Sequence, residues 1–226
     1  MIPIRDTAPN RTFPSITWMI IILCGCVFLF ENRLPHELLD EFTYYFGIVP
    51  IEYTGRHRHG IPLVDYLSFL TTMFLHGGWL HFLVNMWFLK IFGSKVEDRM
   101  GHSRFLLFYL IVGILASVFY IHFSPRSHMP VIGASGAIAG VMGAYYVLFP
   151  RARILTLIPI LIFPWFVELS AFVFLGWWFL VQLFSSTVAQ VLPSSGEGVA
   201  WWAHIGGFIA GVLLVSLFKK PSLRYN

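Results

Sequence analysis

The sequence predicts an all-α membrane protein, a bundle of six transmembrane helices with interfacial helices in its loops. Hydrophobic residues make up 57% of the 226-residue chain and charged residues only 12%, with a mean hydropathy of +0.73. Charged residues are normally about a quarter of a soluble chain, so lipid must be the solvent for most of this one. Several uncharged apolar runs also approach the roughly 20 residues that cross a hydrocarbon core. They predict a single domain over residues 1–226, with spans at 15–30, 68–92, 105–123, 134–149, 167–186 and 200–218.

Two further stretches are expected to lie in the membrane interface rather than to cross the bilayer. Residues 35–42 begin with Pro35 and carry Glu37 in the first turn, which favours a short amphipathic helix. Residues 154–166 are apolar but are interrupted by Pro159 and Pro164. Proline in a helix interior removes a hydrogen bond and clashes with the preceding turn, so this segment is not predicted to span.

The basic residues predict the orientation of the chain. The formal charge is +4, but Lys and Arg lie in short segments between the spans, so a membrane orientation explains them better than a nucleic-acid partner does. Eleven of the 15 Lys and Arg fall on the side that holds both termini, and four fall on the other side: Arg33, Arg56, Arg58 and Arg126. The richer side is normally cytoplasmic. We therefore expect a multi-pass protein of a bacterial inner membrane, embedded in the lipid bilayer, with both termini in the cytoplasm.

Ser135 is a polar residue at the predicted start of the fourth span, where a polar group is costly. It lies in the run Gly133-Ala134-Ser135-Gly136. The glycines permit close approach of a substrate chain, so Gly133, Ala134 and Gly136 are candidate substrate-binding residues. The helix N-terminus offers free N–H groups to a developing negative charge. Taken alone, the same small residues would suit simple helix packing.

His204, near the start of the sixth predicted span, is the candidate partner of Ser135. Gly207 and Gly211 follow it as a small-xxx-small pair, which lets a neighbouring helix backbone come very near. Two glycine-rich helices packed together would place Ser135 and His204 side by side. A serine hydroxyl is a weak nucleophile until a base takes its proton, and neutral imidazole suits that task. No carboxylate falls inside the spans to orient the histidine, so the sequence predicts a dyad rather than a triad.

His81 and Asn85 are two further polar residues, four positions apart in the second predicted span. At that spacing they share one face of a helix. One interpretation is a hydrogen bond between packed helices. The other is that both side chains donate to an oxyanion, a role worth roughly 3–4 kcal/mol per donor in comparable soluble sites.

Taken together, these motifs resemble those of the rhomboid family of intramembrane serine proteases, in its short six-helix form. The resemblance covers residues 4–218, and its motifs are His76, His81 and Asn85, then Glu97-Asp98-Arg99-Met100-Gly101, then Gly133-Ala134-Ser135-Gly136, then Ala203-His204 with Gly207 and Gly211. It implies Ser135 as nucleophile, His204 as base, and His81, Asn85 and the Ser135 backbone N–H as oxyanion donors. The chain departs from the family pattern at Ala139, where some members stack an aromatic ring on the histidine, and in lacking a Trp-Arg pair in the first loop.

The function expected from this resemblance is endopeptidase cleavage of single-spanning membrane proteins, in or beside their transmembrane segment, with no cofactor and no metal. One alternative is an inactive rhomboid-like protein that binds transmembrane helices without cutting them. Its signature would be loss of Ser135 or His204, and both are present. A transporter is a third class, which would want charged residues along several spans. Glu168 is the only acid near a predicted span, and it sits at the cytoplasmic end of that span, away from Ser135 and His204.

A substrate helix is expected to reach Ser135 sideways, between the second and fifth predicted spans. Val84 and either Trp177 or Trp178 are the candidate gate residues. The two tryptophans are therefore also candidate substrate-binding residues.

Overall fold

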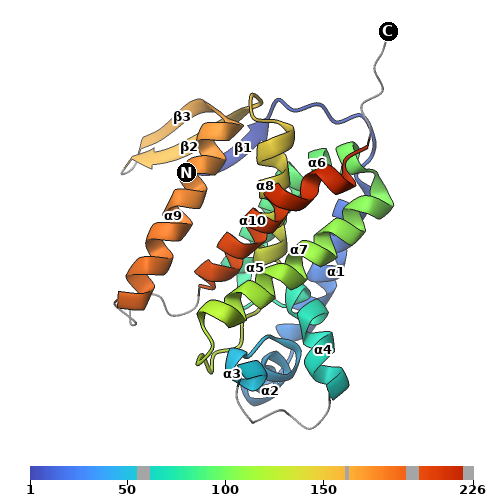
Figure 1. The fold of residues 1–226 in the computed structure, drawn as a ribbon, viewed down its shortest axis with the longest axis vertical. Helices are drawn as coiled ribbons and strands as arrows, with labels where there is room; N and C mark the ends of the chain where they lie inside the picture. Colours follow the sequence, from blue (N-terminus) through green and yellow to red (C-terminus); the bar gives the residue numbers. More distant parts are fainter. Residues whose placement is uncertain (55–61, 161–162, 192–198, 221–226) are drawn as a thin grey trace.

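The computed structural model describes residues 1–54, 62–160, 163–191 and 199–220, and shows a mostly helical chain with one small sheet (Figure 1). The helices are α1 (Ser15–Glu31), α2 (His36–Phe46), α3 (Pro50–Thr54), α4 (Pro62–Thr71), α5 (Trp79–Phe88), α6 (Ser94–Met100), α7 (His102–Phe123), α8 (Ser135–Leu148), α9 (Ala171–Val191) and α10 (Trp201–Phe218). A 3₁₀ turn, η1 (Thr72–Phe74), follows α4, and a π-helical turn, η2 (Leu89–Gly93), joins α5 to α6.

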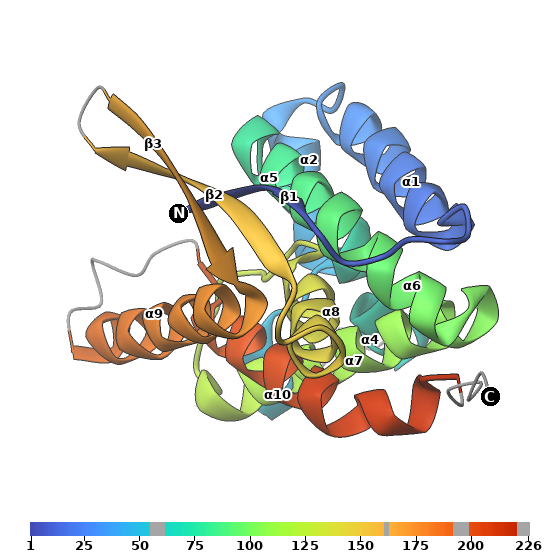
Figure 2. The ribbon, with the colours of Figure 1, turned by 90° about the horizontal axis from the view of Figure 1, so that it is seen from above.

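Helix α8 lies at the centre of the bundle, with α7 and α10 against it and α1 and α9 toward opposite sides (Figure 2). Every residue from 136 to 145 is buried. In the described part of the chain, three helices are long and apolar enough to cross a membrane: His102–Phe123, Ala171–Gln190 and Trp201–Phe218. The bent pair Tyr66–Phe74 and Trp79–Met100 makes a fourth if it counts as one span, while α1 and α8 are shorter apolar helices. The chain is therefore a helical membrane protein.

The span predicted at residues 68–92 is not one continuous helix. The two parts of this region are bent by 89° about a break between Phe74 and Trp79. The backbone N–H of His76 donates to the Glu31 carboxylate at 3.1 Å instead of to a helical carbonyl, and Gly77 and Gly78 that follow are poor helix formers. As a result, the helix after the break, α5, begins at Trp79 and continues through η2 into α6.

The prediction of an all-α fold is also corrected. Two strands, β2 (Arg153–Ile160) and β3 (Phe163–Ser170), pair antiparallel as a β-hairpin, and β1 (Ile2–Asp6) pairs antiparallel with β2 to give the order β1-β2-β3. Pro159 and Pro164 oppose each other near the hairpin tip, where a missing N–H donor does least harm to the ladder. The fifth predicted span consequently starts later, because residues 167–170 belong to β3 and α9 begins at Ala171. By contrast, the amphipathic helix predicted at residues 35–42 is confirmed as α2.

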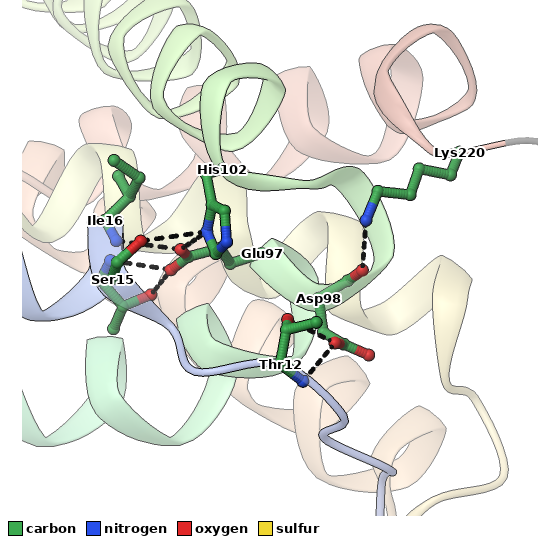
Figure 3. A network of polar contacts seen from close by, with 8 residues as sticks. Thr12, Ser15, Ile16, Glu97, Asp98, His102 and Lys220 are labelled. Carbon is green, nitrogen blue, oxygen red and sulfur yellow. Dashed lines mark hydrogen bonds and ion pairs between the residues drawn. The ribbon is translucent and has the colours of Figure 1, made fainter.

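Two buried acids, Glu97 and Glu31, form hydrogen bonds that connect α1 to neighbouring segments. An acid within the bundle was not predicted from the sequence. Glu97 on α6 is fully buried and accepts hydrogen bonds from the backbone N–H groups of Ile16 (2.9 Å) and Thr17 (2.8 Å), and from His102 Nδ1 at 2.6 Å (Figure 3). It thus caps the N-terminus of α1, where a negative charge is favourable. At the opposite end of α1, Glu31 is 2% exposed and holds His76. The Glu97 contacts hold α1 against α6. The Glu31 contact holds the other end of α1 against the segment at His76, just before α5.

Candidate active site

Helices α8 and α10 touch backbone to backbone along their glycines. A Cβ atom added to Gly207 would overlap the carbonyl oxygen of Gly136, and one added to Gly211 would overlap that of Gly140. Side chains larger than hydrogen would force the two helices apart. This contact brings the first turns of α8 and α10 together, as the two glycine patterns suggested.

Ser135 and His204 lie next to each other at the N-terminal ends of α8 and α10. Ser135 is the first residue of α8, and its Oγ lies 2.9 Å from His204 Nε2. A helix leaves its first N–H groups without intrahelical partners, so the Ser135 hydroxyl sits beside free backbone donors. The geometry suits transfer of the hydroxyl proton to the imidazole.

Gln182 on α9 supplies a third member of this arrangement that was missed in the sequence. It is 5% exposed, and its Oε1 lies 2.7 Å from His204 Nδ1. Its Nε2 donates to the Trp178 carbonyl oxygen at 3.4 Å, which fixes the amide with its oxygen toward the histidine. Because an amide oxygen can only accept, Nδ1 carries the proton and Nε2 is left as the acceptor facing Ser135. An uncharged polar residue inside an apolar helix was the available signal for Gln182.

Two tryptophans flank the imidazole in place of the aromatic residue absent at Ala139. The ring of Trp178 lies 6.1 Å from that of His204 and is tilted by 36°, while Trp201 lies 6.1 Å away nearly edge-on at 86°. Of the proposed gate residues, Trp178 is therefore half-buried against the histidine. Trp177 and Val84 are 56% and 46% exposed on the outer surfaces of α9 and α5.

His81 lies against the backbone immediately before Ser135. Gly133 has φ +130°, and a Cβ added there would lie 2.7 Å from His81 Nε2 and 3.7 Å from Ser135 Oγ. Only glycine adopts such a backbone easily, and here the missing side chain also leaves room for the imidazole. The Gly133 N–H donates to the Thr72 carbonyl oxygen at 2.8 Å, which holds this segment in place.

Asn85 is 5% exposed, one turn below His81 on α5. Within the described residues its side-chain Nδ2 has no hydrogen-bond partner. A buried, unpartnered amide donor costs about 1–3 kcal/mol. Such a group is a candidate donor for a molecule bound at the site.

The fold and the site together define a class: a helical membrane protein that holds a serine–histidine pair at the start of two tightly packed helices. A rhomboid domain matches residues 64–221, more than half of the sequence. The chain belongs to the rhomboid family, as its motifs indicated.

Curated relatives come from organelles and from bacteria. The chain is 31% identical over 231 residues to "Rhomboid protein 1, mitochondrial" of Saccharomyces cerevisiae, covering 90% of this chain and 62% of that protein. It is 27% identical over 219 residues to "Rhomboid-like protein 11, chloroplastic" of Arabidopsis thaliana, covering 94% and 68%. It is 29% identical over 138 residues to the "Putative rhomboid protease YdcA" of Bacillus subtilis, covering 60% and 62%. The chain thus spans about two thirds of the length of these relatives.

Proposed function

We propose that this chain is an intramembrane serine endopeptidase that cleaves single-spanning membrane proteins in or beside their transmembrane segment. The observation that carries the proposal is the 2.9 Å contact between Ser135 Oγ and His204 Nε2. In the proposed reaction Nε2 takes the hydroxyl proton while Oγ attacks the scissile carbonyl carbon. The imidazolium then protonates the leaving amine, and water hydrolyses the acyl-enzyme. His81, Asn85 and the Ser135 N–H are the proposed donors to the tetrahedral oxyanion.

The proposed topology has six spans within one rhomboid-like domain over residues 1–226. α1, the helix from Trp79 to Met100, α7, α8, α9 and α10 would each cross the bilayer, with Ser135 and His204 toward the outer face. The Lys and Arg distribution supports cytoplasmic termini, in a setting of bacterial inner-membrane type. Gly133, which is half-buried, would contact the substrate backbone, while Ala134 and Gly136, which are buried, would hold this segment in place beneath it. Exposed Trp177 and Val84 would meet the incoming helix, and Trp178 would act through its contact with His204.

A fluorophosphonate probe tests the proposal directly. We expect the detergent-solubilised protein to be labelled covalently at Ser135, because the probe reports a serine activated by a base. The labelled peptide would be identified by mass spectrometry, and cleavage of a single-spanning substrate would be followed in parallel. Absence of both labelling and cleavage in folded protein would favour the non-cleaving, helix-binding alternative.

Gln182 should act as a positioning residue for His204. We expect Gln182→Leu to lower kcat roughly tenfold, equivalent to one neutral hydrogen bond, because the imidazole loses its orienting acceptor. Gln182→Glu keeps the acceptor but stabilises the protonated ring, so its activity should fall at a higher pH than that of the wild type on acidification. Gln190→Leu, an exposed position on the same helix, is the matched control. An unchanged pH profile in Gln182→Glu would contradict this role.

Asn85 should contribute mainly to the transition state. We expect Asn85→Ala to lower kcat on the order of a hundredfold with little change in KM, because its unpartnered Nδ2 would bond only the developing oxyanion. Steady-state kinetics with a spanning substrate would measure this, with Leu80→Ala, an exposed position on the same helix, for comparison. Should Asn85→Ala alter thermal stability alone, the residue serves helix packing instead.

A further inference from the structure

A cavity lies beside the first turns of α1, and its lining residue Asp6 contacts Tyr145 near the end of α8 opposite to Ser135. Its volume is about 400 Å³, and it is lined by β1, the first turns of α1, and the α5–η2–α6 segment. Its walls combine charged and aromatic side chains, among them Arg5, Asp6, Trp18, Trp87, Lys90 and Lys95. The Trp87 indole donates to the Pro3 carbonyl oxygen at 2.6 Å, which holds β1 over the cavity.

The free charge in this cavity is positive. The single carboxylate among the six, that of Asp6, is 3% exposed and already engaged by Lys95 at 3.6 Å and by the Tyr145 hydroxyl at 2.5 Å. Burial raises the pKa of the Asp6 carboxyl, and the contacts with Tyr145 and Lys95 act in the opposite direction. Arg5 and Lys90 are exposed and form no ion pair among the described residues. Lys90 Nζ instead lies 5.8 Å from the centre of the Trp18 ring.

Apolar tracks lead away from the cavity along the lipid-facing surface. Ile22 lies one turn beyond Trp18 on the same face of α1 and is 61% exposed. Leu83 lies one turn from Trp87 on the same face of α5 and is 54% exposed. Tryptophan is enriched at headgroup level, so the two rings mark the boundary between polar cavity and hydrocarbon. A free phosphate would use only the charged part of this surface, whereas a phospholipid would use both parts.

We propose that this cavity binds the headgroup of an anionic phospholipid. The phosphate would lie between Arg5 and Lys90, and the acyl chains would run past Trp18 and Trp87 along Ile22 and Leu83. The volume suits a glycerophosphate headgroup, and basic pockets beside membrane-spanning helices bind such headgroups. This site does not depend on proteolysis, because none of these residues contacts Ser135 or His204.

The experiment measures thermal unfolding of the full chain in detergent as short-chain lipid is added. Dioctanoyl phosphatidylglycerol should raise Tm saturably, while dioctanoyl phosphatidylcholine and inorganic phosphate at equal concentration should raise it much less. The double variant Arg5→Gln/Lys90→Gln should weaken the phosphatidylglycerol effect on the order of tenfold in apparent Kd, as expected when two cations near the surface are lost. Native mass spectrometry should show the same loss of bound lipid.

A matched variant separates a built site from general surface charge. Arg99→Gln/Lys219→Gln removes two exposed cations outside this cavity and should leave the apparent Kd within about twofold. The single variant Arg5→Gln gives the same test if the double variant unfolds. Equal weakening by the matched variant, or equal stabilisation by phosphatidylcholine, would overturn the proposal. Equal stabilisation by inorganic phosphate would show an anion site without a lipid.

Discussion

Replacing Ser135 or His204 with alanine should abolish both fluorophosphonate labelling and substrate cleavage. The two side chains form one unit, because the hydroxyl becomes a nucleophile only when His204 Nε2, 2.9 Å away, takes its proton. Catalytic units of this kind lose activity by many orders of magnitude when either member is removed. The double variant should therefore be no less active than either single variant. Cleavage assays and probe labelling of all three proteins would measure this.

Controls must show that the alanine variants are folded. Ser117 is a buried hydroxyl that bonds the Gly113 carbonyl oxygen within α7 at 3.2 Å, so Ser117→Ala removes a comparable group away from the site. We expect Ser117→Ala to stay active, and Ser135→Ala to unfold near the wild-type temperature. Retained cleavage by folded Ser135→Ala would exclude Ser135 as the nucleophile.

The long apolar helices could be predicted because their signal is local. The runs at residues 105–123 and 200–218 coincide with α7 and α10, since a sustained apolar stretch has few alternatives in lipid. The β-hairpin could not be predicted in the same way. Its strand β2 pairs with β1, which is about 150 residues earlier in the chain, and no local pattern records that contact. The break before Trp79 depends likewise on Glu31, which is distant in sequence.

The candidate site could be predicted in part, because polar side chains are rare in apolar spans and so identify themselves in the sequence. Ser135 and His204 are polar residues beside glycines in apolar runs, and the glycine patterns indicated how their helices would pack. Gln182 was missed because its role depends on the rotation of α9 against α10, which the sequence alone leaves open. The same rotation turns Trp178 toward His204 and Trp177 toward lipid.

The second substitution with a large expected effect on cleavage is in the close contact between α8 and α10. We expect Gly207→Ala to lower cleavage by a hundredfold or more, because its new Cβ overlaps the Gly136 carbonyl oxygen and must push α10 away from α8. A displacement of about 1 Å at a reacting pair can cost on the order of a hundredfold in rate. Overpacking of this kind also destabilises a fold by about 1–3 kcal/mol. Cleavage rate and unfolding temperature would be measured together.

Gly176→Ala is the matched control, since a Cβ added at this α9 position meets no atom within 4 Å. It makes the same chemical change in a membrane-embedded helix and should leave both activity and stability close to wild type. Because Gly207 itself has no side chain to react, any loss in Gly207→Ala must act through the distance between the helices. Reduced fluorophosphonate labelling in protein that still unfolds cooperatively would therefore report a separated Ser135–His204 pair. Full activity in Gly207→Ala would show that the two backbones need not touch for the pair to work.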